Sequence, residues 1–199
     1  MSARAVTIIP QTWEFKADEL DSVVPRLLLA ALLAALYAQG AAKAYGWLDV
    51  VIHGEWDPIG QVYRLHVHGY AYGEMIDVVD RLRKLPNYKT RRYLKDGSLS
   101  PVYRRVQVKR KPPKNRLRQI TYRLQSYWPA KAIVISDNGV RKRARQKRRI
   151  AEPHHSQVLL WLDKWDVADL TLMIGLRVTK AGLIQTKRGA KRTQGSSDE

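Results

Sequence analysis

The sequence predicts an α+β fold in which helices pack on an antiparallel β-sheet, and three observations predict it. An Ala- and Leu-rich stretch from Asp18 to about Ala44, with Pro25 near its first turn, is typical of a buried helix or two. Two β-rich segments, 47–55 and 62–70, flank a turn signal and indicate a hairpin. The hydrophobic content of 45%, with six Trp and ten Tyr, excludes a wholly disordered chain.

The middle of the chain yields three further elements. Apolar residues at helical spacing predict a helix over 75–85, which Pro86 ends. Imperfect alternation predicts a third strand over 102–108, and the pattern of 116–128 predicts a helix that ends near Pro129. The hairpin is therefore expected to belong to a sheet of at least three strands.

The C-terminal part is expected to be more open. The run 141–149 holds seven Lys or Arg and indicates either a solvated surface or a basic, partly flexible arm that contacts nucleic acid. Segments 158–162 and 170–176 have the pattern of helical core segments, and 187–199 has the composition of a disordered tail.

The charge is concentrated in the middle of the chain. There are 36 Lys and Arg against 18 Asp and Glu, and residues 81–150 hold 24 of these basic residues with only two acidic ones. A basic, aromatic-rich stretch calls for a polyanionic partner, and nucleic acid is the first expectation. The basic residues expected to contact nucleic acid are Arg64, Arg104, Arg105, Lys109, Arg110, Lys111, Arg118, Arg123 and Lys131.

Composition also excludes several classes of protein. The chain has no Cys, which removes disulfides, thiolate zinc sites and cysteine nucleophiles. The longest apolar run, 27–38, has twelve residues, whereas a bilayer span needs about 20. Acidic residues precede that run where a signal peptide carries cations. We therefore expect a cytoplasmic protein with no membrane partner.

Two histidines are candidate metal ligands. His66 and His68 are two residues apart on a predicted strand, so their side chains project from the same face, together with Arg64, Tyr70 and Tyr72. In an antiparallel hairpin with an even-length loop, that face also carries three polar residues of the preceding strand, namely Asp49, His53 and Glu55. Two imidazoles near a carboxylate suit Mg²⁺, Mn²⁺ or Zn²⁺. The alternative is that the His-x-His pair merely occupies the polar face of a strand.

The segment 65–70, Leu-His-Val-His-Gly-Tyr, resembles the histidine–hydrophobic–histidine motif of the HUH endonucleases. That family includes rolling-circle replication initiators, relaxases and some transposases. The resemblance implies an HUH/RRM-like antiparallel sheet. It also implies that His66 and His68 hold a divalent ion, Mg²⁺ or Mn²⁺, at the scissile phosphate of single-stranded DNA. Glu55 is the preferred third ligand, because the family often draws a carboxylate from the strand before the histidines.

The resemblance further implies a tyrosine nucleophile on a downstream helix, often within a Tyr-x-x-Lys pattern. Tyr122 is followed by Gln125 where the pattern has lysine, and Tyr127 is followed by Lys131 one position late. Helical phase sets Tyr127 within the apolar stripe of the predicted helix and Tyr122 nearly opposite. Tyr122 is therefore the expected nucleophile and Tyr127 the reserve candidate.

The expected function is a replication-initiator-like endonuclease. It would nick single-stranded DNA at a replication origin, leaving a 5′-phosphotyrosine and a free 3′-hydroxyl in rolling-circle replication. The sequence has no GxxxxGK[ST] phosphate loop, so a host helicase and polymerase are expected partners. One alternative is a non-catalytic basic nucleic-acid-binding protein with structural histidines. The other is a transposase or relaxase of the same superfamily. Relaxases usually carry the tyrosine before the histidines, and the order here favours replication or transposition.

This interpretation divides the chain into four parts. They are an N-terminal helical segment 1–45, an HUH-like nuclease core 46–135, a basic arm with a C-terminal helical extension 136–186, and a disordered tail 187–199.

Overall fold

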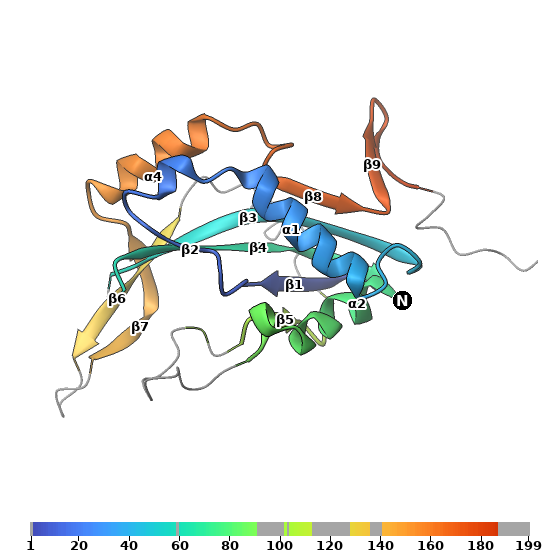
Figure 1. Cartoon of the computed structure of the whole chain (residues 1–199), viewed down its shortest axis with the longest axis horizontal. Helices are drawn as coiled ribbons and strands as arrows, with labels where there is room; N and C mark the ends of the chain where they lie inside the picture. The colour runs from blue at the N-terminus through green and yellow to red at the C-terminus, as the bar shows by residue number, and fades with distance from the viewer. Residues whose placement is uncertain are drawn as a thin grey trace, which may run out of the picture.

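The computed structural model describes residues 2–58, 60–90, 102, 104–112, 128–135 and 141–186, and for 131–135 and 141–147 it describes the backbone alone. Within these residues the chain is a mixed α/β structure that combines a curled, mostly antiparallel sheet with three α-helices (Figure 1). The predicted mixture of helices and a mostly antiparallel sheet is confirmed. No helix among the described residues is both long enough and apolar enough to cross a bilayer.

A long hairpin forms the centre of the sheet. Its strands are β3 (Gly46–Asp57) and β4 (Val62–Gly73), each twelve residues long. They are antiparallel throughout, in a register that pairs Gly46 with Gly73 and Asp57 with Val62. The hairpin predicted from the two β-rich segments is confirmed and extends beyond the expected ends. The four residues 58–61 connect the strands, and the even length of this loop fixes which side chains share a face.

Shorter strands extend the sheet on both sides of the hairpin. The order of strands is β5-β1-β4-β3-β6-β7, with β2 also paired to β4 and β8 also paired to β3. Among the strands that the structure describes, only the β3–β6 pairing, Trp56 with Ala130, is parallel. These strands are β1 (Arg4–Ile8), β2 (Glu14–Lys16), β5 (Val106–Val108), β6 (Pro129–Ile135), β7 (Arg141–Arg149) and β8 (Thr171–Ile174). The β5 strand confirms the third strand expected within 102–108.

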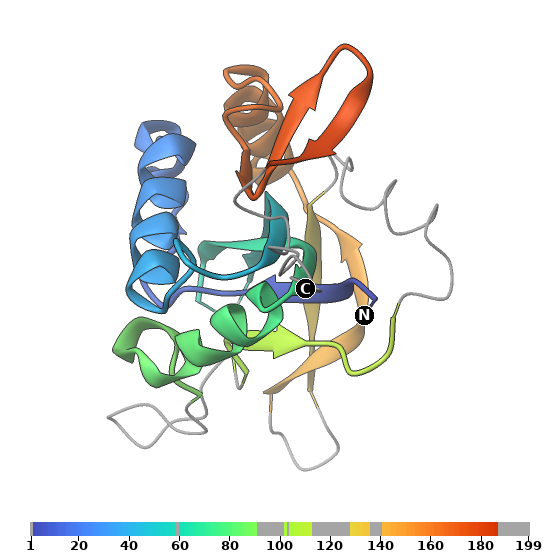
Figure 2. The same cartoon turned by 90° about the vertical axis from the view of Figure 1, so that its right-hand side faces the viewer.

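The helices are short and begin after well-defined signals in the sequence. α1 (Pro25–Ala38) has proline at its first position, where the missing N–H costs no helical hydrogen bond. α2 (Met75–Arg81) follows the hairpin and continues as a 3₁₀ turn, and α4 (His154–Asp163) follows Pro153. The 3₁₀ turns are η1 (Leu20–Ser22), η2 (Leu82–Lys84) and η3 (Pro86–Tyr88). A separate hairpin of β9 (Leu176–Thr179) and β10 (Gly182–Gln185) projects from the sheet (Figure 2).

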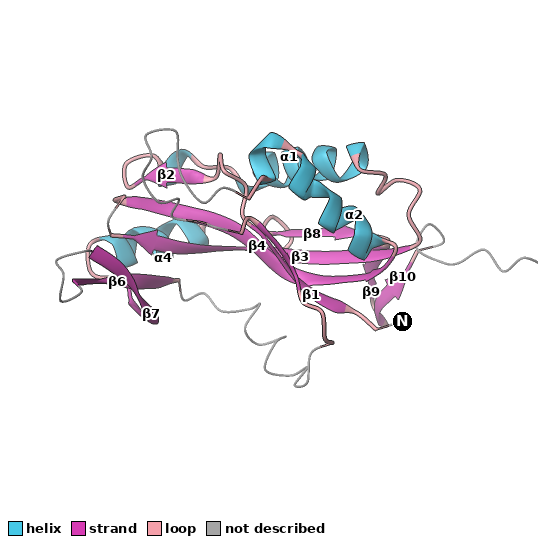
Figure 3. Ribbon diagram, turned by 90° about the horizontal axis from the view of Figure 1, so that it is seen from below, coloured by secondary structure: helices cyan, strands magenta, loops and turns pink. Residues whose placement is uncertain are grey.

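The hydrophobic core lies between the helices and one face of the sheet. Figure 3 shows α1 and α2 on the same side of the strands. The β3 side chains Leu48, Val50 and Ile52 are buried on that face, as are Leu65 and Val67 of β4. Burying each such side chain contributes about 1.5–3 kcal/mol. The opposite face of the hairpin carries the polar and aromatic residues, so the two faces separate as the alternation predicts.

α4 is anchored to this core through tryptophans. The Trp161 indole Nε1 donates a hydrogen bond to the Val23 carbonyl at 2.9 Å, and the Trp161 ring lies 5.4 Å from the Trp128 ring. Trp128 in turn lies over Gly54, where an added Cβ would come within 2.4 Å of its ring. The start of β6 is thereby held against β3.

Several sequence predictions are wrong. Residues 1–45 are not a purely helical segment, because 4–8 and 14–16 form β1 and β2 within the sheet. Residues 171–174 form the strand β8 rather than helical core, since they pair antiparallel with β3. In both cases cross-strand pairing overrides a weak local preference. The backbone of the basic run 141–149 forms strand β7, paired with β6, and its role as a solvated surface or a contact for nucleic acid stays a prediction. The predicted helix within 116–128 falls mainly outside the described residues, as does the tail 187–199.

Candidate metal and nucleic-acid site

The face of the hairpin opposite the core carries the candidate ligands. His66 lies directly opposite His53 in the ladder, and His68 lies opposite Val51 on one side and Thr7 of β1 on the other. The expectation that His53 and Glu55 share a face with the two histidines is confirmed. We call this surface of β3 and β4 the histidine face; it comprises Trp47, Asp49, Val51, His53, Glu55, Arg64, His66, His68, Tyr70 and Tyr72.

The two predicted ligands converge at their ring nitrogens. The Nε2 atoms of His66 and His68 are 2.9 Å apart. The Nδ1 atom of His66 lies 3.2 Å from the Arg64 carbonyl oxygen, which can only accept, so this nitrogen carries the proton and Nε2 of His66 is an acceptor. The Nδ1 atom of His68 lies 2.8 Å from the Thr7 hydroxyl. His66 therefore presents a lone pair toward His68 in its neutral form.

The Thr7 hydroxyl lets His68 take either of two tautomers. With its proton on Nε2, His68 donates to His66 and accepts from Thr7. With its proton on Nδ1, His68 donates to the hydroxyl oxygen and presents an Nε2 lone pair beside that of His66. The second arrangement is the one that a shared cation requires, since metal-bound imidazoles are fixed by a hydrogen bond from the other ring nitrogen.

The spacing of the two nitrogens fits a divalent ion. Two ligands at right angles, each about 2.1 Å from an ion, lie about 3.0 Å apart, close to the 2.9 Å separation observed. Among the residues that the structure describes, no group of three or more His, Cys, Asp and Glu side chains is arranged to hold a metal. His66 and His68 would thus supply two ligands, and the remaining positions would fall to water and phosphate oxygens.

Glu55 lies on the expected face, but its carboxylate contacts an arginine. It stands opposite Arg64 in the ladder, and Arg64 Nη1 donates to Glu55 Oε1 at 3.2 Å. The residue opposite His66 is His53, whose ring centroid lies 5.3 Å from that of His68 and 6.4 Å from that of His66. The register therefore brings a third imidazole, rather than the Glu55 carboxylate, next to the histidine pair.

Arg64 is the centre of a buried ionic cluster. Its side chain is 2% exposed, and besides Glu55 it donates to Asp57 Oδ2 at 2.8 Å and to Glu14 Oε1 at 3.1 Å. Burial by itself lowers the pKa of the Arg64 guanidinium, yet the carboxylates of Glu14, Asp57 and Glu55 together raise it above its usual value. The Arg64 guanidinium is thus paired with three carboxylates inside the protein, and its predicted contact with nucleic acid stays a prediction.

The other basic candidates divide into buried, exposed and undescribed residues. Arg105 is 3% exposed and its guanidinium lies 3.7 Å from the Glu14 carboxylate, and its predicted contact with nucleic acid stays a prediction. Arg118 and Arg123 lie outside the described residues, and for Lys131 only the backbone, in β6, is described. The exposed candidates lie next to β5 and are Arg104, Lys109, Arg110 and Lys111. The two tyrosine candidates, Tyr122 and Tyr127, lie outside the described residues.

Aromatic residues occupy the far end of the histidine face. Trp47 and Tyr72 stand opposite each other and stack, with ring centroids 5.8 Å apart and an interplanar angle of 20°. Tyr45 meets the edge of Tyr72 at 6.1 Å, and a side-chain hydrogen bond with Tyr72 raises the pKa of the Tyr45 phenol. The sequence placed Tyr70 and Tyr72 on this face; the same alternation applied to β3 would also have placed Trp47 there.

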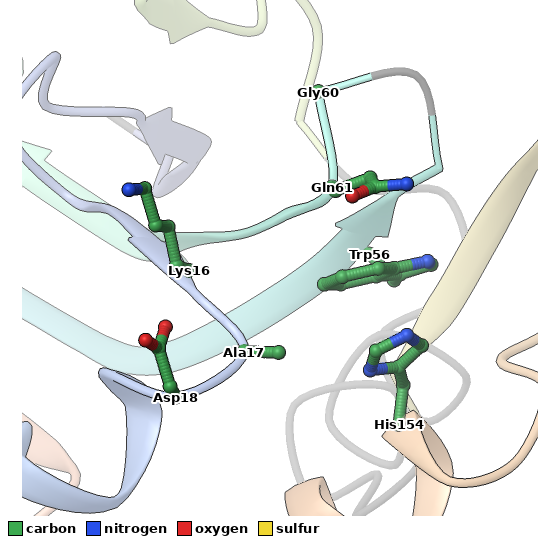
Figure 4. A pocket seen from close by; sticks show the side chains of 7 residues that line it. All are labelled: Lys16, Ala17, Asp18, Trp56, Gly60, Gln61 and His154. Atoms are coloured by element: carbon green, nitrogen blue, oxygen red, sulfur yellow. The ribbon is translucent and has the colours of Figure 1, made fainter.

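A separate cavity of about 450 Å³ lies at the turn end of the hairpin. Its lining is shown in Figure 4 and comprises Lys16, Ala17, Asp18, Trp56, Gly60, Gln61 and His154. The His154 ring stacks on Trp56 at 3.9 Å, and Gln61 lies on the other side of the indole (Figure 4). Trp56 and His53 are three residues apart on β3, so they point to opposite faces. The cavity is therefore separate from the histidine pair.

Comparison of the chain with models of protein families, with curated proteins and with solved structures gives no match.

Proposed function

We propose that this protein is an endonuclease of the HUH type that nicks single-stranded DNA through a tyrosine, as a rolling-circle replication initiator does. The observation that carries the proposal is the pair of Nε2 atoms, 2.9 Å apart, which His66 and His68 present from the central strand of an antiparallel sheet. An HUH/RRM-like arrangement of that sheet is part of the proposal. It is supported by the position of β4 between β1 and β3.

In the proposed reaction, His66 and His68 position the scissile phosphate through a divalent ion, Mg²⁺ or Mn²⁺. Such an ion supplies Lewis-acid polarisation of a phosphate oxygen when it is bound. The phenolic oxygen of Tyr122, with Tyr127 in reserve, forms a bond to phosphorus while the bond from phosphorus to the 3′ oxygen breaks. The tyrosine loses its proton and the 3′ oxygen gains one, which leaves a 5′-phosphotyrosine and a 3′-hydroxyl.

The substrate and partners follow from the same proposal. Single-stranded DNA at a replication origin would approach the histidine face, guided by the exposed cations Arg104, Lys109, Arg110 and Lys111. A host helicase and polymerase would unwind and extend the nicked strand, and the reaction would take place in the cytoplasm. A transposase of the same superfamily would use the same site on a different DNA end.

The experiment is incubation of the purified protein with a labelled pool of single-stranded oligonucleotides and Mn²⁺, with and without EDTA, followed by a denaturing gel. A metal-dependent covalent adduct is expected, and it should disappear in His66→Ala and His68→Ala. His154→Gln, which changes an imidazole outside the site, is the matched control and should keep the adduct. Binding without any adduct across a diverse pool would contradict the nicking function.

A non-catalytic nucleic-acid-binding protein is the second candidate. It is favoured by the contact of His66 with His68 and by the Glu55–Arg64 ion pair, since both satisfy polar groups of the site within the protein itself. That candidate predicts salt-dependent binding to oligonucleotides with no change on addition of EDTA. The same oligonucleotide pool therefore separates the two functions.

A further inference from the structure

The histidine face continues beyond the histidines as a row of aromatic side chains. Along β4 every second residue from His66 to Tyr72 points to this face, and the last two members of that row are Tyr70 and Tyr72. Trp47 of β3 lies opposite Tyr72, and Tyr45 touches the Tyr72 ring from the edge. We call Tyr45, Trp47, Tyr70 and Tyr72 the aromatic platform.

The platform is not part of the hydrophobic core. Its four side chains are each partly exposed, and those of Trp47, Tyr70 and Tyr72 lie on the face of the hairpin opposite Leu48 and Ala71. On the core face of the same strands, Leu48 and Ala71 have no exposed surface. The four platform side chains keep some exposed surface, whereas Asp49, Val51, His53 and His66 on the histidine face are buried.

Glycines surround the platform where bulkier residues would crowd its rings. The ladder that pairs Leu48 with Ile174 places Gly175 beside Trp47. Gly175 has a φ of +74°, and a Cβ there would lie 2.4 Å from the Gly46 carbonyl oxygen. Only glycine fits this position without strain, and it adds no side chain beside the Trp47 ring. Gly46 and Gly73 flank the same end of the hairpin.

Both cations and carboxylates lie around the platform: Asp49 stands opposite Tyr70, and Glu74 accepts a hydrogen bond from the Tyr45 backbone N–H at 2.8 Å. The β9–β10 hairpin begins immediately after Gly175 and presents Arg177 and Lys180 as exposed residues, and β9 lies against β3. Figure 1 shows this hairpin at the same end of the sheet as the N-terminus, where β3 begins. Lys43, just before the platform, is also exposed. Partly exposed aromatic rings with exposed cations nearby are a combination that binds unpaired nucleotides, by base stacking and phosphate attraction.

We propose that the aromatic platform stacks unpaired bases of the same single strand whose phosphate reaches His66 and His68. This inference rests on the proposed function for its substrate and extends it by a second contact on one continuous face. His53 lies six positions after Trp47 on β3, which corresponds to about 20 Å at roughly 3.3 Å per residue. Several nucleotides of an extended strand cover that distance. The platform thereby holds the strand at a second point, distant from the scissile phosphate. It also selects unpaired over paired DNA.

The test compares two ligands that differ only in their bases. Fluorescence anisotropy measures the affinity of the full chain, with EDTA present, for a labelled twelve-nucleotide oligo-dT and for a twelve-unit abasic deoxyribose-phosphate chain of equal charge. Wild type is expected to prefer oligo-dT by about 5- to 100-fold, the size of one or a few stacking contacts. In Trp47→Leu and Tyr72→Leu this preference should fall toward unity while the affinity for the abasic chain stays unchanged.

Matched variants separate stacking from damage to the fold. Trp47→Phe and Tyr72→Phe keep a π-face and should keep most of the preference for oligo-dT. Tyr37→Leu removes an exposed aromatic residue of α1, on the other face of the sheet, and should keep the whole preference. If the wild type binds oligo-dT and the abasic chain with equal affinity, that result alone overturns the inference. So would an unchanged preference in the leucine variants.

The same assay distinguishes failure of this inference from failure of the nicking function. His66→Ala should abolish the covalent adduct but keep the preference for oligo-dT. If no adduct forms in wild type and the base preference is present, the platform stands and the protein is a binding protein. If the adduct forms and the preference is absent, nicking stands and the platform is refuted.

Discussion

Glu55 stands directly opposite Arg64 in the central hairpin, with Arg64 Nη1 3.2 Å from Glu55 Oε1. This pairing makes Glu55 part of an ionic cluster, whereas the sequence favoured it as a third metal ligand. We therefore expect Glu55→Gln to lower the free energy of unfolding by about 1–3 kcal/mol, because a charge-assisted hydrogen bond is lost. Mn²⁺ affinity, measured by titration calorimetry, should change little. A loss comparable with that of His66→Ala would restore Glu55 as a ligand.

Thr7 is expected to control the metal affinity of His68 without touching the ion. Its hydroxyl oxygen lies 2.8 Å from His68 Nδ1 and can accept a hydrogen bond from the N–H that the metal-binding tautomer carries there. Thr7→Val keeps the shape and removes this acceptor, so Mn²⁺ affinity should fall by about 10- to 100-fold. Thr179→Val changes a threonine of β9 away from the histidines and should leave the affinity unchanged. Equal affinities for wild type and Thr7→Val would exclude a positioning role.

The sequence predicted the faces of the hairpin better than its register. Alternation alone placed His53, His66 and His68 on one side of the sheet, because every even-length loop gives that result. Which residue stands opposite His66 depends on the loop 58–61 and on the full twelve-residue ladder. In the observed register His53, and not Glu55, stands opposite His66. The local sequence pattern could not predict the register, because every register that keeps the same two faces buries the same apolar residues.

Long-range pairing explains the remaining differences from the sequence predictions. β1 and β2 are short, and a short stretch of residues shows little periodicity, yet β1 lies between β4 and β5 in the sheet. Arg64 was expected on the surface because arginine usually is. Its burial depends on Glu14, which is fifty residues away in sequence and reaches it through the β2–β4 pairing. Neither contact leaves a signal within its own segment.

The buried Arg64 cluster predicts a large loss of stability in one variant. Arg64→Met would leave the carboxylates of Glu14, Glu55 and Asp57 near one another without the cation that contacts all three. The free energy of unfolding, measured with urea at neutral pH, should fall by about 3–5 kcal/mol. Arg26→Met removes an ion pair with Asp169 whose arginine side chain is 76% exposed, and it should cost at most about 1 kcal/mol. Similar losses in the two variants would contradict the cluster's role.

Two buried phenols predict a loss of stability at alkaline pH. Burial raises the pKa of Tyr88 to about 12, and burial together with the charge of Glu152 raises that of Tyr63 to about 12, from an ordinary value near 10. Both phenols are protonated in the folded state. Their contribution to the free energy of unfolding is therefore complete below about pH 10 and is lost as the pH rises through 12. Urea unfolding between pH 8 and 12 should show this decline. The decline in the free energy of unfolding should be shallower in Tyr88→Phe than in Tyr37→Phe, a control at an exposed tyrosine.

The choice of nucleophile is the prediction that bears most directly on the chemistry. Trp128 is 1% exposed, with its ring over Gly54 in the core, and the sequence alone assigns Trp128 and Tyr127 to one apolar stripe. Tyr122 lies nearly opposite that stripe in helical phase. Tyr122→Phe should therefore abolish the covalent DNA adduct and leave oligonucleotide affinity within about twofold, because it removes one hydroxyl and no charge. Tyr127→Phe should keep the adduct. Peptide mapping of the wild-type adduct gives the independent measurement, and label on the peptide that carries Tyr127 would assign the attack to that residue instead.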